Sequence, residues 1–223
     1  MRLYHGSEKI VDRPVYGKGR KNNDYGMGFY CTEDWDLAAE WAVDIQRDGF
    51  VNSYDIDTKG MQILDLNSSE YGILHWISLL LANRRFDLGT PLEREAYRYL
   101  TDTFLPDTAG VDLIRGYRAD DSYFSYAQDF ISGAISVSQL KAAMQLGNLG
   151  EQIMIRSREA FSKLVYQKSE GVFSKEWYEK KHRREDLART TYRQWDKSSY
   201  VKGDLYIIRI LDEEVKPDDP CLR

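Results

Sequence analysis

Residues 26–32 read Gly-Met-Gly-Phe-Tyr-Cys-Thr, and they predict a short strand that is entered through a flexible Gly-x-Gly and leads directly into a helix. Thr32 is a candidate N-cap, because its hydroxyl can accept a hydrogen bond from a free N–H group of the first helical turn. Beyond it, apolar side chains recur at helical spacing, at Trp35, Ala38, Ala39, Trp41, Ala42 and Ile45. The segment therefore predicts a strand–helix unit that carries Tyr30.

Two further polar motifs lie on predicted strands far from this unit. Upstream, residues 1–4 predict a strand that runs into His5-Gly6-Ser7, and the loop over residues 14–25 is rich in Gly, Lys and Asn. Downstream, Glu151-Gln152 head an apolar strand. Each motif alone has an ordinary explanation, since a lone histidine is usually a structural hydrogen-bonding residue and a polar pair at a strand end is common.

The rest of the chain alternates predicted strands and helices. Residues 51–56 and 61–66 are two strands joined by the turn-type sequence 57–60, which predicts a hairpin. The apolar run 205–211 is open between strand and helix. The other predicted elements are helices over 71–83, 92–104, 122–131, 137–146, 159–166 and 175–197, with strands over 112–116 and 151–155. This pattern favours an α+β fold.

Composition limits the classes of function. The chain has 223 residues, 42% hydrophobic and 30% charged, as a globular domain does, and its net charge of −5 argues against non-specific coating of nucleic acid. Two cysteines, Cys31 and Cys221, are too few for a disulfide framework, which favours the cytoplasm. With three histidines and no cysteine cluster, we expect no metal site. The apolar stretch 73–82 is too short to span a bilayer, and no secretory signal is visible, so we expect no membrane contact.

In this order, the three motifs resemble the ADP-ribosyltransferase superfamily of the diphtheria-toxin and poly(ADP-ribose)-polymerase type. In that superfamily, a His-Gly strand, a Gly-x-Gly-x-Tyr strand with its helix, and a Glu-headed strand surround NAD⁺. The closer resemblance is to a family of uncharacterised bacterial proteins within it, and it runs through residues 5–7, 24–32, 112–121 and 151–152. It implies a split, mostly antiparallel sheet with inserted helices, with residues 1–168 as the catalytic domain and residues 169–223 as a helical C-terminal extension.

The resemblance makes NAD⁺ a co-substrate and assigns the first motif to its binding. His5 is expected to hold the 2′-hydroxyl of the adenosine ribose, which orients the dinucleotide. Gly6 is expected to let the backbone approach the nicotinamide carboxamide closely. Ser7 and Gly28 are the other candidates for cofactor binding in these strands.

The remaining candidates surround the reacting end of NAD⁺. Tyr30 is expected to stack on the nicotinamide ring, and Trp41 to complete an aromatic sandwich that stabilises the cationic ring. Either Glu151 or Gln152 would hold the 2′-hydroxyl of the nicotinamide ribose, near the charge that develops in the transition state. Polymerase-type relatives carry a glutamate on the late strand and a small hydroxyl residue on the helix. At these two positions this chain has Gln152 and Ala38, respectively. Single ADP-ribose transfer is therefore favoured over polymer synthesis.

The predicted function is mono-ADP-ribosyl transfer from NAD⁺ to a protein or nucleic-acid acceptor. By resemblance, the chain is expected to be a bacterial toxin of a toxin–antitoxin or phage-defence system, with an antitoxin protein as a partner. Two rival interpretations are a non-catalytic NAD⁺ or ADP-ribose-binding module and an RNA 2′-phosphotransferase. The second lacks support, because residues 4–7 do not supply the extra basic groups that it needs.

Several other residues have open or ordinary interpretations. The basic and aromatic segment 175–197 favours a solvated helix, with a nucleic-acid platform or an antitoxin-docking face as alternatives. Asp120-Asp121 predict a helix N-cap with a charged first turn, with an acceptor-orienting role as the alternative. His75 and Cys31 are expected to be core residues.

Overall fold

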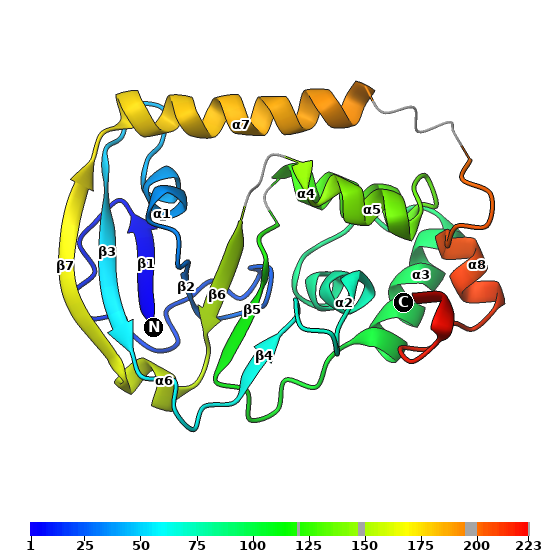
Figure 1. Cartoon of the computed structure of the whole chain (residues 1–223), viewed down its shortest axis with the longest axis horizontal. Helices are drawn as coiled ribbons and strands as arrows, with labels where there is room; N and C mark the ends of the chain where they lie inside the picture. The colour runs from blue at the N-terminus through cyan, green and yellow to red at the C-terminus, as the bar shows by residue number, and fades with distance from the viewer. Residues whose placement is uncertain (120, 147–149, 195–199, 223) are drawn as a thin grey trace.

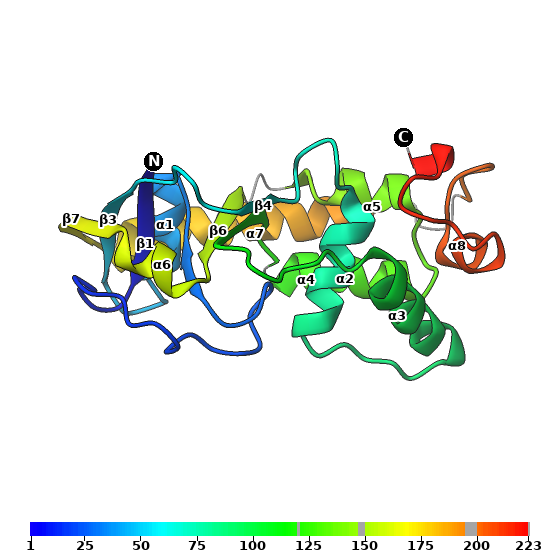
Figure 2. The same ribbon diagram turned by 90° about the horizontal axis from the view of Figure 1, so that it is seen from below.

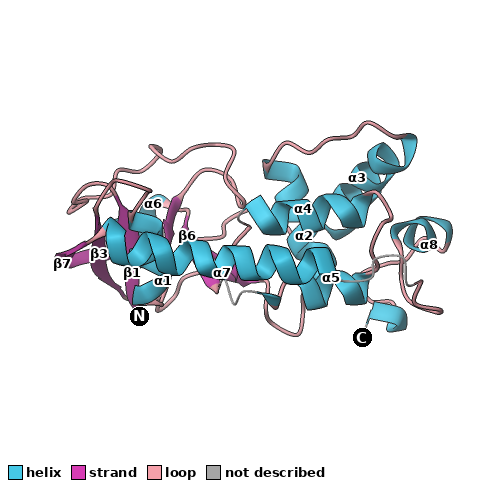
Figure 3. Cartoon of the chain, turned by 90° about the horizontal axis from the view of Figure 1, so that it is seen from above, coloured by secondary structure: helices cyan, strands magenta, loops and turns pink. Residues whose placement is uncertain are grey.

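The computed structural model describes residues 1–119, 121–146, 150–194 and 200–222. It is a mixed α+β structure, as the sequence predicts. Figure 1 shows the strands gathered toward one end of an elongated molecule and most helices at the other, with the long helix α7 (Ser174–Gln194) running along one side from the strands to the helices. The view from above in Figure 3 shows the same path of α7.

The first sheet is antiparallel and has the order β1-β3-β7. Its strands are β1 (Arg2–Ser7), β3 (Gly49–Ile56) and β7 (Leu164–Val172). Strand β1 is longer than predicted and includes His5, Gly6 and Ser7, with His5 opposite Asn52 of β3. The first motif is therefore held by backbone hydrogen bonds of a sheet rather than by a loop.

The second sheet has the order β2-β6-β5-β4. Its strands are β2 (Phe29–Cys31), β6 (Glu151–Ile155), β5 (Leu113–Tyr117) and β4 (Ile63–Asp65). The predicted hairpin between residues 51–56 and 61–66 is wrong, because β3 and β4 belong to different sheets. Strand β4 pairs in parallel with β5, and the Gln62 N–H donates to Asp112 Oδ2 at 2.9 Å, so a partner distant in sequence determines its place.

The two sheets meet where β1 and β2 run side by side. A single antiparallel bridge joins Tyr4 to Thr32, with N···O distances of 2.8 and 2.9 Å. At the next residue of β1, the strands are joined by a side chain instead of the backbone. His5 Nδ1 lies 2.7 Å from the Tyr30 carbonyl oxygen. The strands thus separate at the positions occupied by the first two sequence motifs.

Helix α1 (Trp35–Ala42) follows β2 and packs on β1 and β3. Its N-cap is Asp34, whose carboxylate accepts from the N–H groups of Asp36 and Leu37, so the prediction of Thr32 as N-cap is wrong. Thr32 is instead tied into the bridge to β1, and its hydroxyl accepts from the Asp34 N–H at 3.1 Å. The aspartate is two residues closer to the first helical turn, which it can therefore reach.

Four helices are inserted between strands of the second sheet. Helices α2 (Ile73–Asn83) and α3 (Pro91–Phe104) lie between β4 and β5, and helices α4 (Asp121–Ile131) and α5 (Val137–Ala143) lie between β5 and β6. Figure 2 shows them together beside the second sheet. They share one large apolar core, which includes the fully buried Trp76, Leu80, Phe104 and Phe130.

The C-terminal part differs from expectation at two points. Helix α6 (Arg158–Ser162) is short, and β7 begins at Leu164, so a helix over 159–166 is wrong in its second half. The run 205–211 resolves as the helix α8 (Ile207–Asp212), followed by a 3-10 turn, Pro220–Leu222. The expected domain boundary after residue 168 lies inside β7, and α8 packs on the core of the inserted helices.

Helix α7 carries most of the basic and aromatic segment. Its aromatic residues Trp177 and Tyr192 are buried, at 7% and 4% exposure, so they serve as core contacts. Its exposed basic groups pair with acidic residues one turn away, for example Lys180 with Glu176 and Arg183 with Glu179. Residues 195–197 of this segment lie outside the described residues. Within the described chain, no helix has both the length and the apolar character needed to cross a membrane.

Candidate functional site

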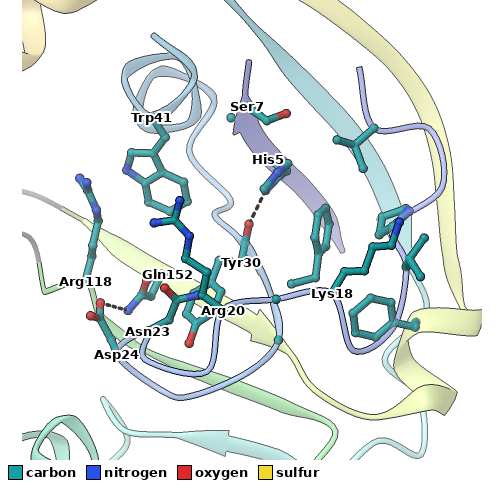
Figure 4. Close-up of a pocket in the computed structure, with 18 of the residues that line it drawn as sticks. His5, Ser7, Lys18, Arg20, Asn23, Asp24, Tyr30, Trp41, Arg118 and Gln152 are labelled. Carbon is teal, nitrogen blue, oxygen red and sulfur yellow. Dashed lines mark hydrogen bonds between the residues drawn. The ribbon is translucent and has the colours of Figure 1, made fainter. Parts of the chain in front are cut away.

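A cavity of about 880 Å³ lies where the two sheets separate. Its walls come from β1, the loop between β1 and β2, helix α1, the residues after β5 and the start of β6. Figure 4 shows side chains from all these elements around the same space. Seven of the eight residues predicted from the sequence line it, namely His5, Gly6, Ser7, Gly28, Tyr30, Trp41 and Gln152, whereas Glu151 does not.

The His5 ring is oriented by the backbone. Its Nδ1 lies 2.7 Å from the Tyr30 carbonyl oxygen, and because a carbonyl can only accept, Nδ1 must carry the hydrogen. Burial lowers the pKa of His5, while the hydrogen bond to Tyr30 acts in the opposite direction. A neutral ring with a proton on Nδ1 has a free lone pair on Nε2, so this nitrogen is an acceptor for a hydroxyl group in the cavity.

The Tyr30 hydroxyl is used within the protein. It donates to the Gly26 carbonyl oxygen at 2.7 Å and accepts from the Tyr25 N–H at 3.0 Å. Burial raises the pKa of Tyr30 strongly, so the phenol stays protonated. The side chain therefore offers its ring face to the cavity, while its hydroxyl ties the preceding loop to β2.

Gln152 is held by a buried carboxylate. Its Nε2 donates to Asp24 Oδ2 at 2.8 Å, and both residues are about 5% exposed or less. The same carboxylate accepts from the Ala119 N–H and from Arg84 Nη1, each at 2.9 Å. Burial raises the pKa of Asp24, and these three donors oppose the shift. Because the amide nitrogen of Gln152 already donates to Asp24, its carbonyl oxygen is the atom that could accept a hydrogen bond from a ligand.

Glu151 lies on the other face of the sheet from Gln152, as neighbouring residues of a strand do. Its carboxylate accepts from Arg115 Nε and from Asn67 Nδ2, each at 2.7 Å, and Arg115 also pairs with Glu33. This partly exposed network joins side chains of β5 and β6 to residues that follow β2 and β4. Of the two candidates that the sequence leaves open for the late strand, the geometry brings Gln152 to the cavity.

Two glycines of the motifs are explained by packing. A Cβ atom on Gly6 would lie 1.9 Å from the Ala38 carbonyl oxygen, and one on Gly28 would lie 2.4 Å from Met154 Cγ. Gly6 thus allows helix α1 to lie directly against β1, and Gly28 allows the loop to cross β6. The expected close approach of backbone to nicotinamide is not needed to account for either residue.

Asn52 organises the loop that leaves β1, although the sequence analysis did not select it. This fully buried side chain donates to the His5 carbonyl oxygen and to Ser7 Oγ, and it accepts from the Val11 N–H at 2.9 Å. The Ser7 hydroxyl in turn donates to the Lys9 carbonyl oxygen. The predicted strand 51–56 contains Ser53 and Asp55 as well, so the sequence gives no signal that selects Asn52.

Trp41 and Arg118 form the wall next to Gln152. The Arg118 guanidinium lies over the Trp41 ring, 5.2 Å from its centroid. Among the described residues, neither Trp41 Nε1 nor Arg118 Nη1 has a hydrogen-bond partner, although both atoms are buried. Figure 4 shows Arg118 on the Gln152 side of the cavity and Lys18 on the opposite side. Arg118 and Asp24 could not be recognised as site residues from the sequence, because each depends on contacts with distant segments.

The cavity is strongly basic, although the whole chain is acidic. Its lining contains one carboxylate, Asp24, which is paired with Arg84, and five cationic residues, namely Arg13, Lys18, Arg20, Arg84 and Arg118. Three of the cations, Arg13, Lys18 and Arg20, come from the loop between β1 and β2. The cavity is therefore suited to a ligand that carries several negative charges.

The other residues discussed from the sequence lie outside the cavity. Cys31 is fully buried in the core beneath β2, and burial raises its pKa. His75 is half-buried in α2, where its Nδ1 accepts from the Gly72 N–H at 3.0 Å. Asp120 is outside the described residues, as is the side chain of Asp121. Among the described residues, no three His, Cys, Asp or Glu side chains are grouped as metal ligands.

The fold and the cavity define an α+β protein with a basic, aromatic-lined cavity between two sheets. Over residues 1–166, the chain matches the model of a family described as "protein of unknown function (DUF3990)". The chain belongs to this family. Searches of the curated proteins and of the solved structures found no match.

Proposed function

We propose that this protein is a mono-ADP-ribosyltransferase, which transfers ADP-ribose from NAD⁺ to a macromolecular acceptor and releases nicotinamide. The observation that carries the proposal is that His5, Tyr30, Trp41 and Gln152, from four separate elements, line one cavity. The cavity volume of about 880 Å³ falls within the range of small-molecule sites and suits a dinucleotide. Its excess of cations matches the diphosphate of NAD⁺.

We also propose that the fold is that of the ADP-ribosyltransferases. Supporting this, two sheets of mostly antiparallel strands separate at β1 and β2, and helices are inserted between strands of the second sheet. The resemblance in sequence requires a His-Gly strand beside a Gly-x-Gly-x-Tyr strand. Strands β1 and β2 meet this requirement, since they are joined at Tyr4 and Thr32.

His5 would orient the dinucleotide through a hydroxyl group. With its proton on Nδ1, the ring can accept a hydrogen bond at Nε2 from a ribose hydroxyl. The lowered pKa favours this neutral form near neutral pH. His5 is therefore a binding residue in this proposal and moves no proton.

Tyr30 and Trp41 would bind the nicotinamide ring. Since the Tyr30 hydroxyl is engaged by Gly26 and Tyr25, its contribution is the face of the ring. An aromatic face attracts a cation, and the pyridinium of NAD⁺ carries the positive charge that is lost when the glycosidic bond breaks. The two residues therefore support binding of the substrate, and release follows when nicotinamide becomes neutral.

Gln152 would act at the ribose where the reaction occurs. The bond between ribose C1′ and the nicotinamide nitrogen breaks, and its electron pair leaves with neutral nicotinamide. The acceptor nucleophile then forms a bond to C1′ and loses its proton to solvent. The Gln152 carbonyl oxygen, fixed by the bond from Nε2 to Asp24, can accept from the ribose 2′-hydroxyl and hold the cationic sugar in position. A neutral amide cannot deprotonate a hydroxyl, which favours transfer of a single ADP-ribose.

The proposal is tested by incubating the purified protein and a cell lysate with NAD⁺ labelled in its adenylate part and measuring nicotinamide. We expect nicotinamide release and a labelled macromolecule with the wild type, and loss of both with Tyr30→Ala and Gln152→Ala. Folding of each variant is checked by circular dichroism. Binding of NAD⁺ without release of nicotinamide, in the presence of lysate, would instead favour the non-catalytic binding module.

From the sequence resemblance, we further propose that the enzyme acts as a bacterial toxin that an antitoxin protein restrains. Expression in a bacterial host is then expected to slow growth, and His5→Ala, Tyr30→Ala and Gln152→Ala are expected to relieve the effect. Equal toxicity of the three folded variants and the wild type would contradict the assignment of the cavity.

A further inference from the structure

The wall beside Gln152 contains two buried donors that the protein does not satisfy. Trp41 Nε1 and Arg118 Nη1 both line the cavity, and neither has a hydrogen-bond partner among the described residues. Buried donors without partners are rare, because each loses its hydrogen bonds to water. A ligand with acceptor oxygens would satisfy both, and the positive charge of Arg118 favours an anionic one.

Two cations of the loop lie on opposite sides of the cavity, since Arg20 lies near Trp41 on the side of Arg118 and Lys18 lies away from it (Figure 4). Arg118 lies beside Trp41 and Gln152, whereas Lys18 lies on the far side of the cavity (Figure 4). The loop thus supplies Arg13, Lys18 and Arg20 to the cavity, and these suffice for the two charges of the diphosphate in NAD⁺. In the proposed binding mode, Gln152 holds the nicotinamide ribose. Arg118, which lies beside Gln152, is therefore near the C1′ atom that the acceptor must reach.

A basic and aromatic cluster continues from this wall. Arg84 also lines the cavity, and its guanidinium lies 5.3 Å from the centroid of the Phe124 ring. Phe124 in turn packs on Phe86, with ring centroids 4.4 Å apart and planes inclined by 33°. Both phenylalanines are only partly buried. Alternation of arginines with partly exposed aromatic rings is a pattern that binds single-stranded nucleic acid, because bases stack on the rings and phosphates pair with the cations.

We propose that the acceptor is a single-stranded nucleic acid, with one phosphate held by Arg118 and Trp41 and neighbouring bases stacked on Phe124 and Phe86. This inference rests on the proposed function and specifies its substrate class. In the reaction, a nucleophilic atom of the strand forms the bond to C1′, nicotinamide leaves with the electron pair, and the strand releases one proton to solvent. The strand lies along Arg118, Arg84 and the two phenylalanines.

The first test measures binding of a short fluorescein-labelled single strand of mixed sequence, as RNA and as DNA, by anisotropy and without NAD⁺. Arg118→Gln is expected to raise Kd about tenfold, since a charge-assisted contact is lost. It should also lower the slope of log K against log salt by about 0.7, the value for one phosphate of a single strand. Phe124→Leu, which keeps an apolar side chain but removes the ring, is expected to raise Kd about fivefold or more with little change in that slope.

The matched control is Arg98→Gln. Arg98 is an exposed arginine on α3, away from the cavity, and its side chain is 67% accessible. We expect its strand Kd to stay within about twofold of wild type, because exposed ion pairs contribute little. Equal Kd values for wild type and the Arg118→Gln and Phe124→Leu variants, or no strand binding by the wild type, would overturn the inference.

The second test shows whether Arg118 binds a phosphate of the strand or of NAD⁺. It also distinguishes failure of this inference from failure of the proposed function. With labelled NAD⁺ and the same strands, Arg118→Gln is expected to lower the ratio of labelled nucleic acid to released nicotinamide about tenfold. A raised KM for NAD⁺ with unchanged strand binding would assign the phosphate to NAD⁺ and overturn the inference. So would wild-type label in lysate that protease removes and nuclease does not. If the wild type binds strands but releases no nicotinamide from NAD⁺ with any strand or lysate, the proposed function itself is wrong.

Discussion

Asp24 and Gln152 stand 128 positions apart in the chain and are joined by a buried hydrogen bond of 2.8 Å from Gln152 Nε2 to Asp24 Oδ2. This contact connects the loop between β1 and β2 with the start of β6, at one wall of the cavity. It leaves the carbonyl oxygen of the Gln152 amide as the atom free to face the cavity. It also anchors the loop, since Asp24 binds Arg84 and the Ala119 N–H as well.

Asp24→Asn is expected to destabilise the fold by about 1.5–3 kcal/mol, the range for hydrogen bonds to charged groups, because the buried charge of the acceptor is lost. The measurement is the urea midpoint at neutral pH. Asp55→Asn serves as the control, since that carboxylate is exposed and pairs with Arg2 at the surface. A midpoint that shifts no more for Asp24→Asn than for Asp55→Asn would show that the carboxylate does not hold the loop.

Stability should fall as the pH is lowered below about 6.5, in part because of His5. Burial lowers the pKa of His5 in the folded state below its ordinary value of 6.5, so in that window the unfolded chain binds a proton more readily than the folded one. The stability that the neutral His5 contributes is fully present above pH 6.5. It is lost as the pH falls through the lower pKa that His5 has in the folded state. Urea midpoints between pH 7 and 5 should therefore decline less steeply for His5→Gln than for the wild type.

His75→Gln should also make the decline less steep, because burial lowers the pKa of His75 in the folded state as well. The double variant should lose both contributions. If the slope of the His5→Gln variant equals that of the wild type, then His5 has the same pKa in the folded and the unfolded chain.

Gly6→Ala is expected to disrupt the contact between β1 and α1. The added Cβ would lie 1.9 Å from the Ala38 carbonyl oxygen and 2.8 Å from the Ala42 nitrogen, so the helix must move. Overpacking of this kind costs about 1–3 kcal/mol or more. Thermal unfolding followed by circular dichroism measures the loss. Gly171→Ala in β7, where the nearest atom is 4.0 Å from the added Cβ, should unfold near the wild-type temperature.

Glu151→Gln and Gln152→Glu should have different consequences for nicotinamide release. Glu151 points away from the cavity to Arg115 and Asn67, so its substitution should leave the release rate within about twofold of wild type, as is usual away from a site. Gln152→Glu would set a second carboxylate against Asp24 and should lower the rate strongly. Single-turnover measurements with labelled NAD⁺ compare the two. A larger loss of release rate for Glu151→Gln than for Gln152→Glu would show that the site lies on the opposite face of β6.

Elements with strong local signals could be predicted from the sequence. Helix α3 begins at Pro91 behind Thr90, whose hydroxyl accepts from the Glu93 N–H at 3.2 Å, and it ends two residues before Pro106. Strand β6 has the predicted bounds, Glu151–Ile155. In both cases, capping, helix-breaking or apolar residues act within a few positions, so the sequence contains the information directly.

Elements whose partners are distant could not be predicted in the same way. The sequence 61–66 looks like the second half of a hairpin, but β4 pairs with β5, whose strand begins about fifty residues later. Residues 164–166 continue an apparent helix but become an edge strand, since β3 offers hydrogen-bond partners there. Pairing energy between strands depends on which segments meet, and this is not encoded locally.

By itself, the sequence determined the α+β class and the identity of seven of the residues that line the cavity, because motifs with glycines, aromatic residues and a histidine stand at strand ends. Only the tertiary structure decided between Glu151 and Gln152, since neighbours on a strand face opposite sides and the packing of the sheet selects one side for the cavity. Tertiary structure also brought Asp24 and Arg118 to the cavity and set Asn52 against the loop that leaves β1. Their roles come from contacts with backbone and side chains far along the chain, which no local pattern records.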